Sequence, residues 1–572
     1  MSALDWVVVA GYLGGTLWLG VWMARRGSKS LAEYFVGGRA IPWWLAGASM
    51  AATTFNVDTP LYVTGLVARR GVAGNWEWWS FAFAHVLMAV VLARLWRRAE
   101  VMTDAELIEL RYRGGAAALL RGTRAFFFGI PLNCIAIGYG MLAMRKVLVA
   151  LDVVSVLNLP GDPQLWAVII IVVLTLVYAA ASGLWGVVTT DFLQLVLALV
   201  GAVLVAGYAL AEVGGLGALR TQLEAAGRGD ALRMVPRPGD LALPFGTFLA
   251  YLTLQWWTFR GADGGGMFVQ RLSSVRDERE AERAAGLFNI LNYVVRTWPW
   301  VIVALAALVV LPQLDDPELA YPLMMKKYLP AGVLGLVFAS LLAAFMSTVS
   351  TQVNWGASYA VRDLYQRFVA PEAGQERLVA VGRAATVVIT MLAALASFFM
   401  DDVGKVFRFM ILFGNGTGAV LLLRWFWWRV NAWTEWSALL AGTTIAVLLT
   451  AVPTLAALSF GAKLAITAFG AMAVWVPVML LTPPERAETL DAFFILARPG
   501  GPGWGPVRER TGVAPAAPLG RDLAEAGATL LAVVGLMLAL GGVVVGSTAW
   551  VAGSGATALV GWWGRRHLRR ER

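Results

Sequence analysis

The chain has few of the residues that metal centres and disulfide frameworks need. Its 572 residues include one cysteine, Cys134, and two histidines, His85 and His567. A single cysteine excludes an internal disulfide and any multi-cysteine metal site, and two histidines exclude a histidine-cluster centre. The glycine run GADGGG has no Lys-Ser or Lys-Thr after it, so it does not match a phosphate-binding loop. We therefore expect no cofactor and no enzyme active site.

Charged residues are also scarce, at 14% of the chain against about a quarter in soluble domains. Hydrophobic residues make up 59%, and apolar runs long enough to cross a bilayer recur along nearly the whole length. The net charge of +10 does not indicate nucleic acid, because the arginines lie in short loops between apolar runs. The composition predicts an all-α polytopic membrane protein in contact with the lipid bilayer.

The apolar runs predict about 13 to 15 transmembrane helices. The first run is interpreted as a retained helix, because Asp5 lies near its start and no small-x-small cleavage pattern follows it. The last two runs are short and rich in glycine, so a re-entrant hairpin remains an alternative there. The predicted spans are 4–24, 41–68, 76–97, 124–149, 164–182, 184–211, 243–268, 283–311, 331–361, 379–400, 403–425, 433–453, 462–482, 524–545 and 547–564.

The distribution of basic residues between the spans predicts the orientation. With the N-terminus outside and the C-terminus inside, most of the arginine-rich loops lie on the inner side of a bacterial cell (inner) membrane. Residues 213–242 are then an outer loop, and the Pro- and Gly-rich segment 483–523 lies on the inner membrane surface. The inner loops would contain Arg25 and Arg26, the stretches Arg94 to Arg124, Arg271 to Arg283 and Arg362 to Arg383, then Arg424, Arg429 and the basic tail.

Two of the spans are interrupted by polar or glycine-rich residues. SMAATTFNVDTPLYVTG places Asn56 and Asp58 in mid-span, and YLTLQWWTFRGADGGGMFVQR places Arg260 and Asp263 beside three glycines. In lipid, such a backbone leaves amides unpaired unless it lines a cavity. The breaks occupy corresponding positions in two consecutive five-helix halves, which is typical of the inverted repeats of secondary transporters, with the solute site at the breaks.

Hydroxyl residues cluster in the span 331–361. Ser347, Ser350 and Thr351 share one helix face, and Ala344, Ser347 and Thr348 share an adjacent one. Neutral oxygens suit a hard cation such as Na⁺, although small hydroxyl residues also pack helices together. Asp191, in the span 184–211, is an acidic residue within an apolar segment, where it needs a partner or a function unless the helix end exposes it to water.

Four motifs in this order resemble the sodium/solute symporter family, which includes sugar, proline and sialic acid symporters. They are YFVGGRAIPWW, SGLWGVVTTDFLQ, QRLSSVRDEREAERA, and the stretch from AYP through FASLLAAFMSTVSTQVN to YAVRDLY. The resemblance implies a LeuT-type 5+5 inverted-repeat core. Its domains would be residues 1–40 (an extra helix and first inner loop), 41–430 (the transport core, with halves 41–211 and 243–425) and 431–572 (extra helices).

The same resemblance implies the site residues. Sodium would bind the carbonyls of Ala52, Phe55 and Ala344 with the hydroxyls of Ser347 and Thr348, and a second sodium site would use Asp191, Ser347, Ser350 and Thr351. The solute positions match the family less well, since several family residues are replaced. The solute candidates are Asn56, Asp58, Thr59, Glu77, Ser80, Trp257, Thr258, Arg260, Asp263 and Asn292.

The function expected from these features is Na⁺-coupled symport of a small polar solute by alternating access, by a monomer or weak oligomer. The solute is a sugar, an amino acid or an organic acid. Two alternatives share the scaffold: a proton-coupled transporter with Asp191 as the proton site, and a non-transporting membrane sensor. Arg260 and Asp263 could also pair with each other, and the tryptophans near Glu77 could form either an interfacial belt or a stacking platform.

Overall fold

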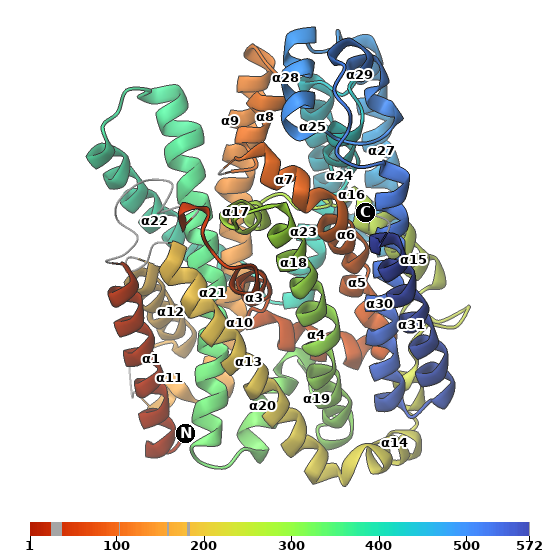
Figure 1. Ribbon diagram of the computed structural model, residues 1–572. Coiled ribbons are helices and arrows are strands. Elements are labelled where there is room, and N and C mark those ends of the chain that lie inside the picture. The colour runs from red at the N-terminus through yellow and green to blue at the C-terminus, as the bar shows by residue number, and fades with distance from the viewer. Residues whose placement is uncertain (25–36, 102, 157–159, 180–183, 571–572) are drawn as a thin grey trace.

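The computed structural model describes the whole chain except residues 25–36, 102, 157–159, 180–183 and 571–572. Within the described ranges the regular elements are all helices, which confirms the predicted all-α class (Figure 1). Arg25, Arg26 and the last residues of the predicted span 164–182 lie outside the described residues.

Every predicted span coincides with a helix or a run of helices. Among the described residues, nine helices are long and apolar enough to cross a membrane, or ten if the pair α23 (Val403–Phe413) and α24 (Gly418–Phe426), bent by 42°, is one span. The nine are Val72–Ala99, Gly115–Ala150, Val187–Val213, Glu278–Val310, Val333–Val369, Gln375–Phe398, Ala432–Ala451, Phe460–Leu481 and Leu519–Val545. The other predicted spans are short, broken or less apolar: α1 (Ala3–Ala24), α12 (Pro163–Ala179), α31 (Thr548–Arg570) and the two interrupted helices.

Both predicted interruptions are present as breaks in helices. The first separates α3 (Trp43–Thr53) from α4 (Asp58–Arg70), and the second separates α16 (Trp256–Thr258) from α17 (Met267–Ser274). In the second break Gly264 and Gly266 have φ of +77° and +76°, a conformation that side chains with a Cβ rarely adopt. The glycine run therefore lies directly before α17, where Gly266 is the N-cap, and sets the direction in which that helix begins.

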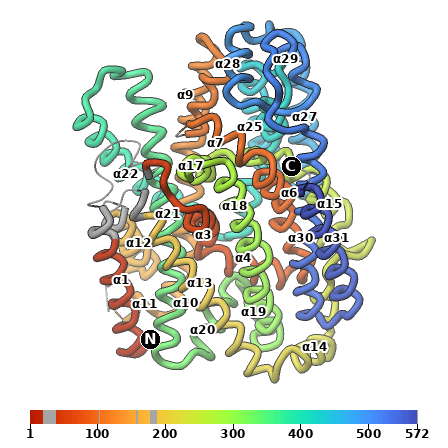
Figure 2. The backbone as a smooth tube through the Cα atoms, viewed as in Figure 1, coloured from red at the N-terminus to blue at the C-terminus, as the bar shows by residue number. Residues whose placement is uncertain are grey.

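The broken helices lie at the centre of the molecule. α3 packs against α13 (Leu184–Val213), α18 (Glu278–Asn289) and α21 (Val333–Ser358). At one edge lies the hairpin of α30 (Leu519–Val545) and α31 (Figures 1 and 2). In that hairpin a Cβ on Gly535 would approach the backbone nitrogen of Ala558 to 2.7 Å, so glycine permits the close helix contact. The last two predicted spans therefore form a hairpin of two long helices.

Several arginines predicted to lie in inner loops are instead buried. Arg111, Arg124, Arg271 and Arg424 all lie in the protein interior. The prediction that they are loop residues is wrong, because each of them lies within a helix. Carboxylate, carbonyl or hydroxyl oxygens inside the protein accept their hydrogen bonds. The segment 483–523 likewise packs on protein. Its helix α28 (Ala487–Ala497) buries Phe493 and Phe494, and Arg111 lies over the ring of Phe493.

Candidate functional site

The first break faces the hydroxyl cluster of α21. The Thr348 hydroxyl donates to the carbonyl of Thr53 over 3.1 Å, which brings the end of α3 against α21. Ala52 and Phe55 flank this carbonyl, and Ala344 and Ser347 lie on the same helix as Thr348. All five predicted residues of the first sodium set are buried. The structure thus brings the two halves of that set together.

Asp191 of α13 lies beside the same cluster. It accepts hydrogen bonds from the hydroxyls of Ser347 at 2.6 Å and Ser49 at 2.5 Å. The guanidinium of Arg271, at the end of the second broken helix, lies 3.7 Å from the Asp191 carboxylate and also donates to Ser49 and Thr351. Asp191 is therefore neither at a wet helix end nor alone, because an arginine accompanies it in the interior.

Ser49 and Arg271 are site residues that the sequence prediction missed. Ser49 lies one turn before Thr53 on a helix of small residues, so it resembles a packing residue. Arg271 lies near the charged run RDEREAER, which indicated a loop. The one available signal was its position three residues after the predicted span 243–268, which holds the second break. Ser350 donates to the carbonyl of Ser347 over 3.1 Å, so every side chain of the second sodium set is engaged within the protein.

Four solute candidates gather at the first break. The Asn56 side chain accepts from the amide of Val57 at 2.8 Å, and the backbone amide of Thr59 donates to the Asn56 carbonyl at 3.1 Å. Asn292 accepts from Thr54 at 3.1 Å. Asp58 is buried, and its Oδ1 has no hydrogen-bond partner among the described residues. This end of α4 therefore carries polar groups that do not all have a hydrogen-bond partner among the described residues.

Arg296 is a further residue at this break that the sequence prediction did not single out. It lies one helical turn after Asn292 and donates to the Ala51 carbonyl at 3.3 Å and to the Thr54 hydroxyl at 3.2 Å. No carboxylate of a described residue lies within 4.0 Å of it. Arg296 therefore caps the carbonyl end of α3, where the helix dipole favours a cation.

Glu77 lies in a separate buried cluster. Tyr62 and Tyr251 donate to its carboxylate at 2.8 and 2.7 Å, and the guanidinium groups of Arg70 and Arg408 lie 2.5 and 3.5 Å away. Gln255 donates to the Glu77 carbonyl, at 2.5 Å, and to the Ser80 hydroxyl, at 3.1 Å. In this conformation Glu77 and Ser80 join helices together, and their polar groups are occupied by protein partners.

The tryptophans around Glu77 are buried. Trp76 and Trp79 have ring centroids 5.6 Å apart, and Trp79 lies 5.6 Å from Trp298. Trp78 is stacked on Tyr293 at 6.2 Å. The interfacial-belt interpretation is wrong for these three residues, because a belt faces the lipid headgroups.

The remaining solute candidates lie at or next to the second break, and each of them has different contact partners. Thr258 hydrogen-bonds to Asn415, and its carbonyl accepts from the amide of Gly416 at 2.9 Å, which ties the break to the bend between α23 and α24. Asp263 is paired with Arg424 at 2.6 Å. It does not pair with Arg260, which has no carboxylate within 4.0 Å among the described residues. Trp257 packs against an apolar cluster that includes Ala419 and Val420 of α24, and its indole donates within its own helix.

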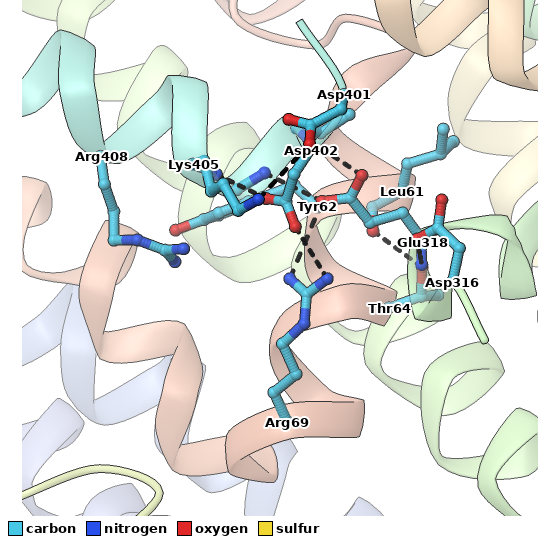
Figure 3. A network of polar contacts seen from close by, with 12 residues as sticks. Leu61, Tyr62, Thr64, Arg69, Asp316, Glu318, Asp401, Asp402, Lys405 and Arg408 are labelled. Atoms are coloured by element: carbon cyan, nitrogen blue, oxygen red, sulfur yellow. Dashed lines mark hydrogen bonds and ion pairs between the residues drawn. The ribbon is translucent and has the colours of Figure 1, made fainter. Parts of the chain in front are cut away.

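A network of polar contacts joins α4 to neighbouring segments (Figure 3). Arg69 lies 3.0 Å from Asp402, the N-cap of α23, and 3.9 Å from Glu318. Glu318 accepts from the amides of Val403 and Gly404, both at 2.9 Å, and is paired with Lys146 at 2.6 Å. Four segments that are distant in sequence therefore meet at one buried carboxylate.

Comparisons with known proteins agree with this geometry. The chain is 26% identical over 470 residues to a sodium/glucose cotransporter of Vibrio parahaemolyticus, covering 76% of this chain and 82% of that protein. It is 25% identical over 494 residues to sodium/glucose cotransporter 4 of Danio rerio, covering 78% of this chain and 71% of that protein. The fold is similar to that of a Na⁺-coupled sialic acid symporter in a substrate-bound outward-open state, with a TM-score of 0.67 at 21% identity, covering 85% and 99% of the two chains.

The likeness to the symporter structure confirms the LeuT-type fold that the resemblance implied. A sequence model of the sodium:solute symporter family matches residues 34–442, which is more than half of the chain and includes both breaks, Asp191 and the hydroxyl cluster. The chain belongs to the sodium:solute symporter family.

Proposed function

We propose that this protein is a secondary active transporter that couples the movement of Na⁺ to the uptake of a small polar solute by alternating access. The observation that carries the proposal is the contact of the first break with α21, where the Thr348 hydroxyl meets the Thr53 carbonyl. Carbonyl and hydroxyl oxygens converge there without a formal charge, which suits a monovalent hard cation. In the proposed site the carbonyls of Ala52, Phe55 and Ala344 and the hydroxyls of Ser347 and Thr348 hold the ion.

The second set, Asp191, Ser347, Ser350 and Thr351, differs from the first because Arg271 already compensates its carboxylate. An ion bound there would need to displace the guanidinium from Asp191 and Thr351, or to share the carboxylate with it. Two like charges at one carboxylate repel each other strongly in a low-dielectric interior. We therefore propose one coupling sodium for the conformation described here.

Sodium and solute are coupled because both favour the same conformation. An ion held between α3 and α21 increases the fraction of the protein that is in the solute-binding conformation. The apparent affinity for the solute rises with that fraction. Movement of α21 away from α3 would separate the two halves of the ion site and release the ion. The membrane potential adds about 2.3 kcal/mol per positive charge per 100 mV.

The proposal also covers the solute pocket, the orientation in the membrane and the extent of the transport core. The solute pocket would be formed at the two breaks, with Asn56, Asp58, Thr59 and Asn292 at the first, Thr258, Arg260 and Asp263 at the second, and Glu77, Ser80 and Trp257 on neighbouring segments. The protein would lie in a bacterial cell membrane with its N-terminus outside and its C-terminus inside, and residues 41–430 would form the transport core.

Uptake into proteoliposomes tests the coupling. An inward sodium gradient should drive accumulation of a transported solute, and replacing Na⁺ by choline should abolish it. Ser347→Ala removes a proposed ligand and should raise the sodium concentration for half-maximal uptake at least tenfold, while Ser358→Ala, whose hydroxyl donates to the Trp355 carbonyl, serves as a control. Accumulation driven by a pH gradient without sodium would contradict the proposal and favour proton coupling.

A further inference from the structure

Arg260 is a cation without an acceptor. It lies in the unwound segment between α16 and α17, and its guanidinium makes no hydrogen bond and has no carboxylate within 4.0 Å among the described residues. Its Nη1 is buried and unpartnered. The guanidinium carbon lies 5.5 Å from the ring centroid of Phe259 and 5.8 Å from that of Phe128. The Arg260 side chain is half-buried, and its guanidinium, which carries several N–H donors, lies against two aromatic rings.

The stem of Arg260 is fixed by a close approach to Gly414 at the end of α23. A Cβ on Gly414 would lie 2.6 Å from both Cγ and Cδ of Arg260. The glycine leaves room for the arginine, and the arginine in turn joins the second break to the bend between α23 and α24. The guanidinium is therefore held at the position where the proposed solute pocket meets the second broken helix.

The buried arginines near the breaks, by contrast, have acceptors. Arg271 is paired with Asp191, Arg424 with Asp263, and Arg124 with both Asp104 and Glu435. The arginines without a carboxylate neighbour donate to carbonyl oxygens instead; these are Arg111, Arg145 and Arg296. Arg260 is thus a positive charge that the surrounding described residues leave uncompensated.

We propose that the transported solute is an organic anion whose carboxylate binds Arg260. The inference rests on the proposed symport and names the solute class. A planar guanidinium binds a carboxylate through two parallel hydrogen bonds, and the rings of Phe128 and Phe259 cover part of the guanidinium. A neutral hexose supplies only hydroxyl groups, so it would leave the charge of Arg260 uncompensated in a low-dielectric site.

Thermal unfolding of the purified full chain in detergent tests the solute class. The probes are matched in shape: D-glucuronate against D-glucose, and L-lactate against glycerol, with choline as a cation, each in sodium and in potassium buffer. We expect D-glucuronate or L-lactate to raise Tm in sodium more than its neutral partner does. Arg260→Gln should weaken that binding at least tenfold, and Arg260→Lys should weaken it less, because the charge remains.

The Tm of the unliganded protein is a second measurement, and it does not depend on which solute is chosen as a probe. Arg260→Gln removes an uncompensated charge, so Tm should rise by about 1–3 °C. The matched control is Arg121→Gln, which breaks the pairs with Asp363 and Glu109 and should lower Tm. If no probe binds, a lower Tm for Arg260→Gln overturns the inference and a higher Tm supports it.

The two proposals fail in different ways. Stabilisation by D-glucose in sodium that is equal in the wild type and Arg260→Gln overturns the anion inference but leaves sodium coupling intact. Stabilisation by an anion that depends on Arg260 but is equal in sodium and potassium supports the anion inference and contradicts the proposed coupling.

Discussion

Asp191 and Arg271 illustrate how charge is kept inside the membrane-spanning core. Each is almost fully buried, and two hydroxyls, Ser49 and Ser347, complete the hydrogen bonds of the carboxylate. A buried ion pair adds little stability in itself, because desolvation offsets the attraction. Removal of one partner is costly because it leaves the other charge uncompensated.

A double-mutant cycle on this pair should therefore be strongly non-additive. Asp191→Asn and Arg271→Gln should each reduce the free energy of unfolding by about 3–5 kcal/mol, and the double variant should be more stable than either single variant. The measurement is thermal unfolding of detergent-solubilised protein in sodium-free buffer. The solvent-accessible pair Arg39 and Glu100, in which Arg39 is half-buried and Glu100 exposed, is the control, for which we expect coupling below about 1 kcal/mol. Additive effects at Asp191 and Arg271 would show that the two charges do not compensate each other.

Of the two residues in this pair, the sequence indicates Asp191 as a site residue but does not indicate Arg271. Asp191 is conspicuous because it is an acidic residue within a long apolar run. Arg271 lies among charged residues at the end of a broken helix, and local sequence cannot distinguish it from a loop residue. Arg260 differs from both: the sequence indicates an unusual charge, but its lack of an acceptor depends on which residues the fold brings near it.

Among the elements, the breaks are predictable and the contacts between them are not. Proline, glycine and polar residues in mid-span mark the ends of α3 and α16 directly. By contrast, Glu318 comes from a short segment outside the predicted spans, yet it accepts from the first amides of α23 and pairs with Lys146 of α10 (Pro131–Ala150). Such contacts join segments that are distant in sequence, so no local pattern indicates them.

The network of polar contacts in Figure 3 should weaken in acid, because protonation of Asp402 removes its charge. Burial alone raises the pKa of this carboxyl, but the Lys405 amide and the charges of Arg69 and Arg408 outweigh it and hold the pKa below its ordinary value of 3.8. A carboxylate with a depressed pKa stabilises the folded state above its unfolded pKa and loses that contribution as the pH falls through the folded pKa. The loss should therefore begin below about pH 4 and amount to less than about 1 kcal/mol, because Arg69 is more than a third exposed.

Asp402→Asn tests this prediction cleanly. Asparagine can still cap α23 by accepting from the Lys405 amide, so only the charge is lost. Unfolding measured between pH 3 and 5 should show a shallower loss of stability in this variant than in the wild type. Asp401→Asn, at a highly exposed neighbouring position, is the matched control and should leave the slope unchanged. Equal slopes for the wild type and Asp402→Asn would rule out a contribution from Asp402.

On the scale of the whole molecule, the predicted spans all coincide with helices, because the length of each apolar run can be counted in the sequence and compared with the thickness of a bilayer. Burial of the arginines limits the prediction of orientation. Arg124, Arg271 and Arg424 are engaged by protein partners in the interior, so they do not report which side of the membrane a loop faces. The proposed orientation then depends on exposed basic residues, among them those of the C-terminal tail together with Arg276, Arg279, Arg283, Arg367, Arg377 and Arg383.

Cysteine labelling should decide the orientation, because the chain has one cysteine and it is buried. In a Cys134→Ala background, Ala226→Cys follows α14 (Gly215–Ala225) and Glu509→Cys lies on α29 (Gly505–Thr511), at opposite ends of the molecule in Figure 1. Both positions are exposed. With the N-terminus outside, a membrane-impermeant maleimide should label position 226 in intact cells and position 509 only after permeabilisation. Ser554→Cys, at a buried position of α31, should stay unlabelled in both conditions. Labelling of position 509 alone in intact cells would reverse the orientation and place the Asp402 network on the inner face.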